Sequence, residues 1–570
     1  MTKSQTIMGG AALVAMMVLG SGEQLSGQSG TALTGTVTSQ QEGEMEGVLV
    51  TARRSEANFD VTVVSDSQGV YRFPRTHLDP GTYAVKIRAV GYDLADPGQA
   101  TVTVGGSATL DLTLKPTADL SNQITSVEWI TSVPGTDEQK AMVVKQIASC
   151  TYCHSLERIV KSRHNAEQMV NVIHRMQKYY PDGTMAGTEG RGRRQLDNQA
   201  AQERAEQNPT WGFVPGVNKV ELAAYLATIN RSDGRSLPAD LQTLPRPAGK
   251  GTQVIITQYD QPRRDTVSHD MDVDSKGRPW YTDQSRPYLG MLDPDTHTFT
   301  EWDLPPVIHH EFAGASDIQV DLDDNLWFPA TNDKAQNHFG LPVKFDPTTE
   351  TFTHVDMPDG AVTQFIARGG PDGKIWSGFG TFYRIDPKTA TMDYSFDWTK
   401  APNLPPGPHS GYEIAVSPEG NPYITDFGGA YIVGVDVATN TAKFHKVPTP
   451  DSQPRRGMID AEGRYWFGEY TGDKIGMFNT RTEEFTEYPL RKWSAPYTSS
   501  LPDREGQVYV PSNTSDRVFR LDTDTGEIVE YLMPTRDFDA KQMVIDPVSE
   551  RAVWMANVRN ARLIKIEPID

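Results

Sequence analysis

The second half of the chain repeats itself, and this repeat restricts the fold more than any other feature of the sequence. From about residue 252, an apolar stretch, an aspartate, a glycine and a Trp-aromatic pair are followed by the pattern Asp-x-x-Thr-x-x-aromatic. The first motif recurs at Trp280-Tyr281, Trp327-Phe328, Trp376, Tyr423-Ile424, Trp466-Phe467, Tyr509-Val510 and Trp554-Met555. The second places Asp293, Asp346, Asp386, Asp436, Asn479 and Asp522 at equivalent positions, roughly 40 to 50 residues apart.

This spacing is typical of propeller blades. One four-stranded sheet cannot bury both of its faces until neighbouring sheets pack against it in a ring. We therefore predict a seven-bladed β-propeller over residues 252–570. A superhelical solenoid is the alternative, but helical periodicity is absent from this region. The chain has 570 residues and thus has room for further domains before the propeller.

Residues 31–118 are rich in Thr, Val and Gly and contain alternating apolar runs at 84–90 and 108–114. Turn sequences at 66–69 and 78–83 each open a strand, so this segment predicts a small β-sandwich. The two turn-and-strand stretches, with Gly91-Tyr92 after the second, resemble the carboxypeptidase regulatory-like domain. That resemblance implies a stabilising or docking module without catalysis.

Residues 135–235 change to helical periodicity, with amphipathic stretches at 141–147, 167–176 and 219–229. The pattern predicts an α-helical domain built around one small site. A polar segment rich in Gly and Arg, 183–208, separates the second and third stretches and is typical of a surface loop. A linker rich in Pro and Leu, 236–251, follows the domain.

The only two cysteines of the chain lie in this helical segment, which excludes a disulfide-stapled framework. Cys150 and Cys153 are followed directly by His154, and Cys-x-x-Cys-His is the attachment motif of a c-type haem. The two thiols can reach the two vinyl groups of one porphyrin while the imidazole faces the iron. A thioredoxin-like pair and half of a zinc site are the alternatives, but neither needs the adjacent histidine.

The sixth iron ligand has more than one candidate. The segments Cys150 to His154, 157–160, 172–176 and 224–226 resemble the short monohaem cytochrome c domains fused to periplasmic oxidoreductases. In that family pattern the methionine closing the second helix matches Met176, which the resemblance implies as the axial ligand. Met185, in the predicted loop, is the alternative, and Met169 fits core packing at helical spacing.

The N-terminal residues 1–30 have the features of a secretory signal. Lys3 precedes an apolar run of about 13 residues and small residues at 20–22, and the run is shorter than the roughly 20 residues needed to cross a bilayer. An uncleaved anchor and a buried helix are the alternatives. We predict a periplasmic or secreted protein with no membrane span after signal cleavage.

The net charge is −20, from 74 acidic and 54 basic residues, which argues against nucleic acid as a partner. The predicted haem domain is nevertheless locally basic. Such a patch would steer an acidic redox partner protein or stabilise haem propionates, although a solvated face explains it equally well. Its cations are Arg158, Lys161, Arg163, Arg175, Lys178, Arg191, Arg193 and Arg194.

The blade motifs at 280–283 and 466–469 resemble the virginiamycin B lyase, or streptogramin lyase, family of seven-bladed propellers. That family eliminates a lactone C–O bond with Mg²⁺, and its catalytic histidine stands 14 residues before the Glu of a Trp-Phe-Thr-Glu motif. Here His269 stands 14 residues before Asp283, whereas Arg455 stands 14 residues before Glu469. Each of these two blades therefore has only one of the two residues of the lyase pattern, the histidine or the glutamate. The resemblance implies His269, Asp283 and Glu469 as catalytic residues, and Mg²⁺ only if the propeller is a lyase.

Further polar residues precede several blades, where a propeller brings them to one mouth of its central channel. They are His309, His310, Glu311, His409, Glu413, Arg455 and Arg456. Such a mouth suits a small anionic or polar substrate, although ordinary loop polarity is the alternative. The sequence thus predicts an exported c-type cytochrome whose propeller binds or oxidises a small substrate. A streptogramin-type lyase with an accessory haem domain and a non-catalytic binding or sensor protein are the alternatives.

Overall fold

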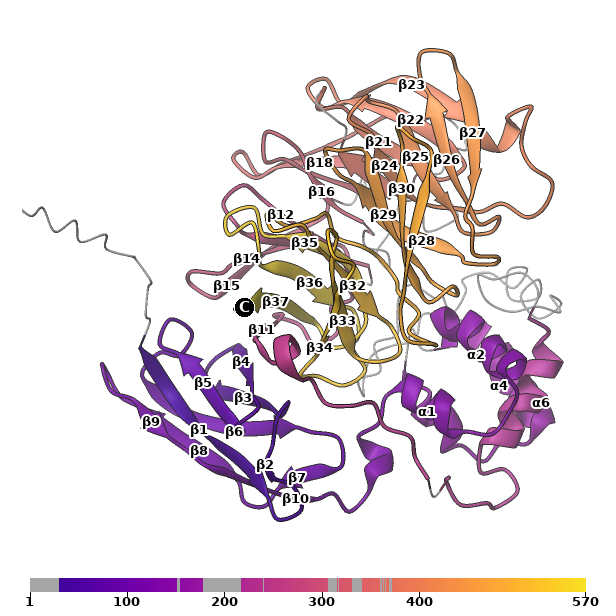
Figure 1. Cartoon of the computed structure of the whole chain (residues 1–570). Coiled ribbons are helices and arrows are strands. Elements are labelled where there is room, and N and C mark those ends of the chain that lie inside the picture. The colour runs from indigo at the N-terminus through magenta and orange to yellow at the C-terminus, as the bar shows by residue number, and fades with distance from the viewer. Residues whose placement is uncertain are drawn as a thin grey trace, which may run out of the picture.

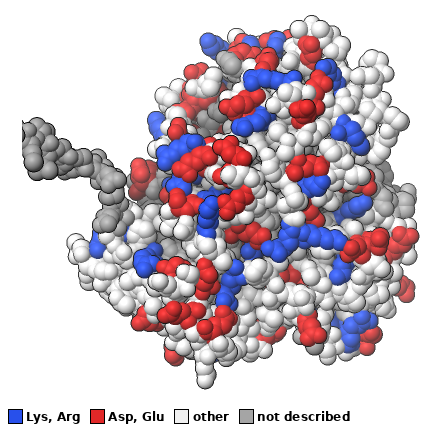
Figure 2. All heavy atoms as spheres, viewed as in Figure 1, with Lys and Arg blue, Asp and Glu red and all other residues white. Residues whose placement is uncertain are grey.

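The structure is a computed structural model that describes residues 30–150, 154–177, 217–238, 240–284, 286–305, 317–330, 341–358 and 372–570, with residues 315, 361, 363 and 365–368. The chain is mainly β and has several domains. In Figure 1 a sandwich (indigo) and a group of helices lie along one side of a ring of sheets (magenta to yellow). The predicted signal segment lies outside the described residues. Acidic and basic side chains are interspersed over the face in Figure 2.

The N-terminal strands form the predicted sandwich. One sheet contains β2, β1, β10 and β7, with β5 and β9 also paired to β1, and the other contains β4, β3, β6 and β8. Val50, Val61, Tyr71, Phe73 and Leu112 belong to the core between them. The strands are β1 (Thr31–Ser39), β2 (Gly43–Glu44), β3 (Leu49–Arg54), β4 (Phe59–Val64), β5 (Val70–Pro74), β6 (Gly81–Arg88), β7 (Tyr92–Leu94), β8 (Gly98–Val102), β9 (Ala108–Thr109) and β10 (Leu112–Pro116).

Residues 120–229, hereafter the helical region, carry helices in the three stretches with helical periodicity. The helices described there are η1 (Leu120–Asn122), α1 (Ser126–Ser132), α2 (Asp137–Cys150), α3 (Glu157–Val160), α4 (Ala166–Gln177) and α6 (Lys219–Ile229). Helix α6 packs against α2, α3 and α4. The sequence analysis did not predict α1, although its capping box of Thr125 and Glu128 is a readable start signal.

The repeat forms seven blades in the described chain, numbered here by their order. Blade one contains β12 (Ser268–Val273), β13 (Pro279–Asp283), β14 (Tyr288–Asp293) and β15 (Thr298–Asp303), and blade two contains β16 (Gln319–Val320), β17 (Leu326–Ala330), β18 (Leu341–Asp346) and β19 (Thr351–His354). Blade three contains β20 (Phe365–Arg368), β21 (Ile375–Gly378), β22 (Thr381–Asp386) and β23 (Thr391–Asp397), followed by η3 (Trp398–Lys400).

The remaining blades follow the same order with one exception. Blade four contains β24 (Gly411–Val416), β25 (Pro422–Asp426), β26 (Tyr431–Asp436) and β27 (Thr441–Lys446), and blade five contains β28 (Pro454–Ile459), β29 (Arg464–Glu469), β30 (Lys474–Asn479) and β31 (Phe485–Pro489). Blade six has only β32 (Gln507–Ser512), β33 (Arg517–Asp522) and β34 (Ile528–Leu532) as regular strands. Its innermost segment is irregular and joins the sheet through a bridge between Pro496 and Ser512.

The aspartates of the repeat explain why each unit folds as a blade. The Asp460 carboxylate accepts the backbone N–H of Arg464 and the indole N–H of Trp466, so it fixes both the first turn and the aromatic side chain of the second strand. At the end of the third strand, Asp436 accepts the backbone N–H groups of Ala438 and Thr439. These Asx turns are local, which is why the motif could be read from sequence.

The ring closes by pairing the two ends of the propeller segment. Blade seven contains β35 (Ala540–Ile545), β36 (Val553–Asn557) and β37 (Arg562–Pro568), and its outer strand is β11 (Val254–Asp260), which follows η2 (Gly249–Thr252). Strand β11 also pairs with β4, so blade seven and one sandwich sheet form a single eight-stranded sheet. The sandwich is therefore built into the propeller rather than tethered to it.

Candidate ligand site at the propeller mouth

The first strands of the blades lie next to one another around the centre of the ring. Strand β12 contacts β16 and β35, and β24 contacts β20 and β28. Their early positions carry charged side chains that are almost completely buried. These side chains are Asp270, Asp317, Glu413, Arg455, Arg456 and Lys541. The centre of the propeller is thus filled by charge rather than by apolar groups.

Arg456, in blade five, contacts residues of four other blades. Its Nε donates to Glu413 Oε2 at 2.5 Å, its Nη1 pairs with Asp270 and donates to the Lys541 carbonyl at 3.1 Å, and its Nη2 lies 3.5 Å from Asp317 Oδ1. Burial raises the pKa of Glu413 to about 7 and that of Asp317 well above its usual value. Burial opposes ionisation of Asp270 too, but the charges of Arg456 and His269 lower its pKa.

Arg455, one residue earlier, lies in a cage of aromatic rings. Its guanidinium carbon is 3.8 Å from the ring centre of Tyr497, 4.6 Å from Tyr470, 4.8 Å from Tyr412 and 5.5 Å from Phe427. Nη2 donates to the hydroxyls of Tyr412 and Tyr497 at 2.9 and 3.0 Å. The rings of this aromatic cage come from blades four, five and six. Their meeting around Arg455 was not predicted from the sequence.

The helical region packs against the same side of the propeller. Phe427, Tyr470 and Tyr497 belong to one apolar cluster with Leu156 and Tyr225 of the helical region. Two ion pairs tie α2 to the propeller: Lys492 Nζ lies 2.5 Å from Asp137, and Lys145 Nζ lies 3.8 Å from Asp451. The aromatic cage around Arg455 is therefore a contact surface between the propeller and the helical region.

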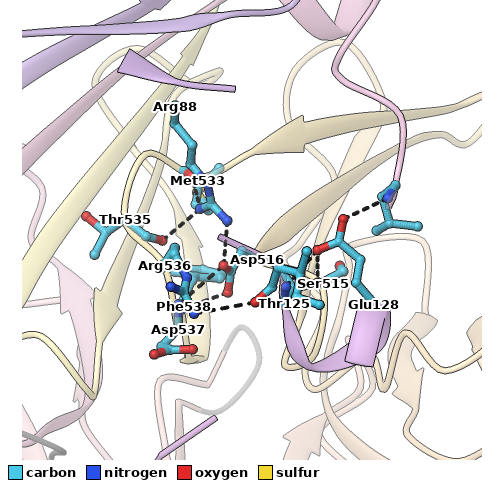
Figure 3. Close-up of polar contacts among 12 residues, drawn as sticks. Arg88, Thr125, Glu128, Ser515, Asp516, Met533, Thr535, Arg536, Asp537 and Phe538 are labelled. Atoms are coloured by element: carbon cyan, nitrogen blue, oxygen red, sulfur yellow. Dashed lines mark hydrogen bonds and ion pairs between the residues drawn. The ribbon is translucent and has the colours of Figure 1, made fainter. Parts of the chain in front are cut away.

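A second junction holds the sandwich and the helical region to blades six and seven (Figure 3). Arg88 of β6 pairs with Asp516 at 2.7 Å and donates to the carbonyls of Met533 and Thr535. Arg536, on the same propeller loop, pairs with Glu157 of α3 at 2.6 Å. The Arg88–Asp516 pair is mostly buried and the Arg536–Glu157 pair is half-buried, and together they join the sandwich and the helical region to the propeller.

The structure places the three predicted catalytic residues in two blades. His269 is buried in blade one with Nδ1 2.7 Å from Asp270 Oδ2, and burial lowers its pKa. Asp283 ends β13 of the same blade, opposite Ser268, and lies 3.4 Å from Arg263 Nη2. Glu469 ends β29 in blade five, so it is not in the same blade as the histidine.

Glu469 is fully buried, and neither of its carboxylate oxygens has a hydrogen-bond partner among the described residues. Burial and the charge of Glu487 together raise its pKa to about 8, against the opposing effect of Lys474. Of the predicted mouth residues, Arg456 and Glu413 bind each other, whereas Arg455 lies in the aromatic cage and His409 binds Asp426 at 2.6 Å. His309, His310 and Glu311 lie outside the described residues.

The predicted haem residues fall in and around α2 and α4. Cys150 is the last residue of α2, and Cys153 and Met185 lie outside the described residues. His154 is half-buried with Nδ1 2.9 Å from the Ser155 carbonyl oxygen. Met176 is half-buried near the end of α4, while Met169 is buried in the apolar cluster.

Among the described residues, no group of three or more His, Cys, Asp or Glu side chains is arranged to hold a metal ion. Within the same residues, none of the helices has the length and apolar character needed to cross a membrane. Asp270, Asp317 and Lys541 were not predicted from the sequence. Their common position at the start of each blade's first strand was the available signal, because equivalent positions of a propeller repeat converge on its axis.

The fold and this site define a multidomain β-propeller protein with an N-terminal sandwich. Residues 32–115 match the family model of the carboxypeptidase regulatory-like domain, which confirms the expectation for that segment. Among curated proteins, none is significantly similar to the chain in sequence.

Solved structures resemble somewhat more than half of the chain. A virginiamycin B lyase from Staphylococcus aureus is 18% identical, covering 55% of this chain and 99% of its own, with a TM-score of 0.47. A streptogramin B lyase is also 18% identical, covering 56% and 99%, with a TM-score of 0.48. The extracellular domain of a protein described as a hybrid two-component system from B. thetaiotaomicron is 16% identical, covering 54% and 41%, with a TM-score of 0.41.

Proposed function

We propose that the protein is an exported c-type cytochrome, with haem held by the helical region and a small substrate bound at the propeller mouth. The observation that carries the proposal is the Cys-x-x-Cys-His motif at the end of α2, in a region packed on the charged propeller mouth. A bound haem would supply one-electron transfer there.

The side chains of the Cys-x-x-Cys-His motif are of the types that would hold a c-type haem. The thiols of Cys150 and Cys153 would form the covalent links, and His154 would be the proximal ligand. Contact of Nδ1 with the Ser155 carbonyl oxygen orients the imidazole, which favours Nε2 as the metal-binding atom. Leu156, immediately after this segment, is fully buried in the apolar cluster, so the chain already excludes water on one side of the motif.

The sixth ligand we propose is Met176, with Met185 as the alternative. Met176 is half-buried one residue before the end of α4, whereas Met169 and Ile173 are buried in the apolar cluster. A redox partner protein would meet the exposed cations of this region, which include Arg158, Arg163 and Arg175.

The test is covalent haem in protein produced in a host that matures c-type cytochromes. We expect haem staining of the denatured band and a sharp α band on reduction, both lost in Cys150→Ala/Cys153→Ala. Met176→Ala should open the iron to carbon monoxide, and Met185→Ala should leave the spectrum unchanged. A colourless wild-type protein from such a host contradicts the proposal.

A streptogramin-type lyase is the second candidate, because His269 and Asp283 lie at the same end of neighbouring strands. We nevertheless expect no Mg²⁺-dependent opening of a cyclic depsipeptide, since Asp283 faces Arg263 and Glu469 lies in another blade. The measurement is turnover of a streptogramin B lactone by wild type and His269→Ala. Turnover by the wild type that is lost in His269→Ala would establish the lyase instead.

A further inference from the structure

Arg455 has hydrogen-bonding capacity that the described chain does not use. The side chain is 2% exposed, Nη2 alone is engaged, and Nε and Nη1 have no acceptor. Within the described residues no carboxylate pairs with it. The hydroxyl of Tyr470, whose ring centre is 4.6 Å from the Arg455 guanidinium carbon, is also buried and has no hydrogen-bond partner among the described residues. Three buried donors of this cage therefore have no acceptor in the part of the chain that the structure describes.

An isolated buried cation is strongly unfavourable, and cation–π contacts do not supply the missing acceptors. The surroundings do not neutralise the charge either. Lys541 also lies over Tyr497, 4.2 Å from its ring centre, and is paired with Asp539. Burial and the charge of Arg455 lower the pKa of Lys541 to about 8, against the opposing effect of Asp539. Such an environment favours an anion with at least two acceptor oxygens.

The cage also lies close to the motif at the end of α2. Three of its rings, Phe427, Tyr470 and Tyr497, belong to one apolar cluster with Val144 of α2 and with Leu156, which follows His154 by two residues.

We propose that Arg455 and Tyr470 bind a carboxylate between the propeller and the helical region, and that this carboxylate is a haem propionate. Arg455 would donate through Nε and Nη1, and Tyr470 through its hydroxyl. The same chemistry would suit the carboxylate of a small molecule. The propionate assignment rests on the proposed function, whereas the carboxylate site itself does not.

The test uses the full haem-loaded chain with Arg455→Met, Arg455→Lys and, as a matched control, Arg481→Met, an exposed arginine of the same blade. In a potentiometric titration, Arg455→Met should lower the midpoint potential of the haem by about 59 mV, which is a tenfold shift toward the oxidised haem. The reason is that a buried positive charge stabilises the reduced state. Arg455→Lys should shift less, and Arg481→Met should match the wild type. The second measurement is a calorimetric titration of the wild type and the variants with benzoate as the probe.

The outcomes separate the two sources of carboxylate. A lower potential in Arg455→Met, without benzoate binding by the wild type, establishes the propionate. Benzoate binding that Arg455→Met weakens at least tenfold, with an unchanged potential, establishes a free carboxylate ligand. If Arg455→Met equals Arg481→Met in both arms, the site is overturned. If the wild type carries no haem, the proposed function fails and the benzoate arm alone decides. If Arg455→Met does not fold, Arg455→Lys is judged by the same comparisons.

Discussion

Replacing Arg456 with methionine should lower the free energy of unfolding by about 3–5 kcal/mol, the range expected when one partner of a buried ion pair is removed. Arg456 is 1% exposed and is bound to Asp270 and Glu413 of two other blades. Without the guanidinium, these carboxyl groups remain buried without their cation. Urea denaturation followed by tryptophan fluorescence measures the change.

The charge network, rather than the loss of packing alone, should account for this effect. Glu413 already has a raised pKa, so Arg456→Met/Glu413→Gln should recover part of the lost stability. Arg464→Met is the matched control in the same blade, because Arg464 pairs with Asp460 and Glu462 nearer the surface and should cost about 1 kcal/mol or less. An Arg456→Met variant no less stable than Arg464→Met contradicts the network.

Replacing Glu469 with glutamine should make the protein more stable at alkaline pH and should flatten its pH dependence. Burial, followed by the charge of Glu487, raises the pKa of Glu469 from 4.5 to about 8. A carboxyl group with a raised pKa stabilises the fold fully below pH 4.5, and this contribution is lost as the pH rises through 8. The loss is at most about 1.4 kcal/mol per pH unit.

The measurement is the free energy of unfolding of both proteins between pH 5 and 9. The difference in favour of Glu469→Gln should grow across this range to a few kcal/mol. Glu484→Gln, an exposed carboxylate of the same blade, should follow the wild type. Parallel curves for wild type and Glu469→Gln would show that the buried carboxyl is ionised without cost.

The blades could be predicted because their signals are local. Asp460 binds Trp466 six residues later, and Asp436 binds Thr439 three residues later, so the repeat motif is itself the hydrogen-bonding pattern of the turns. The sandwich was predicted from alternation and turn residues in the same way. Helix α1 was missed although its capping box of Thr125 and Glu128 is equally local.

The site could be predicted only in part. Arg455, Arg456 and Glu413 were grouped from their equivalent places in the repeat, which a ring brings together. The aromatic cage was not, although Tyr412 and Tyr497 occupy equivalent positions in two blades and Tyr470 directly follows the second strand of a third. The spacing that paired His269 with Asp283 does not reveal that Arg263 lies beside the carboxylate.

By itself the sequence determined the repeating blades, the sandwich and the Cys-x-x-Cys-His motif, because each depends on residues close together in the chain. Only the tertiary structure decided that β11 joins blade seven to the sandwich and that the helical region packs with aromatic rings that surround Arg455. It also put Arg456 and Asp270 in contact across the channel. These contacts join residues far apart in the chain, and they form only when the ring closes and brings distant strands together.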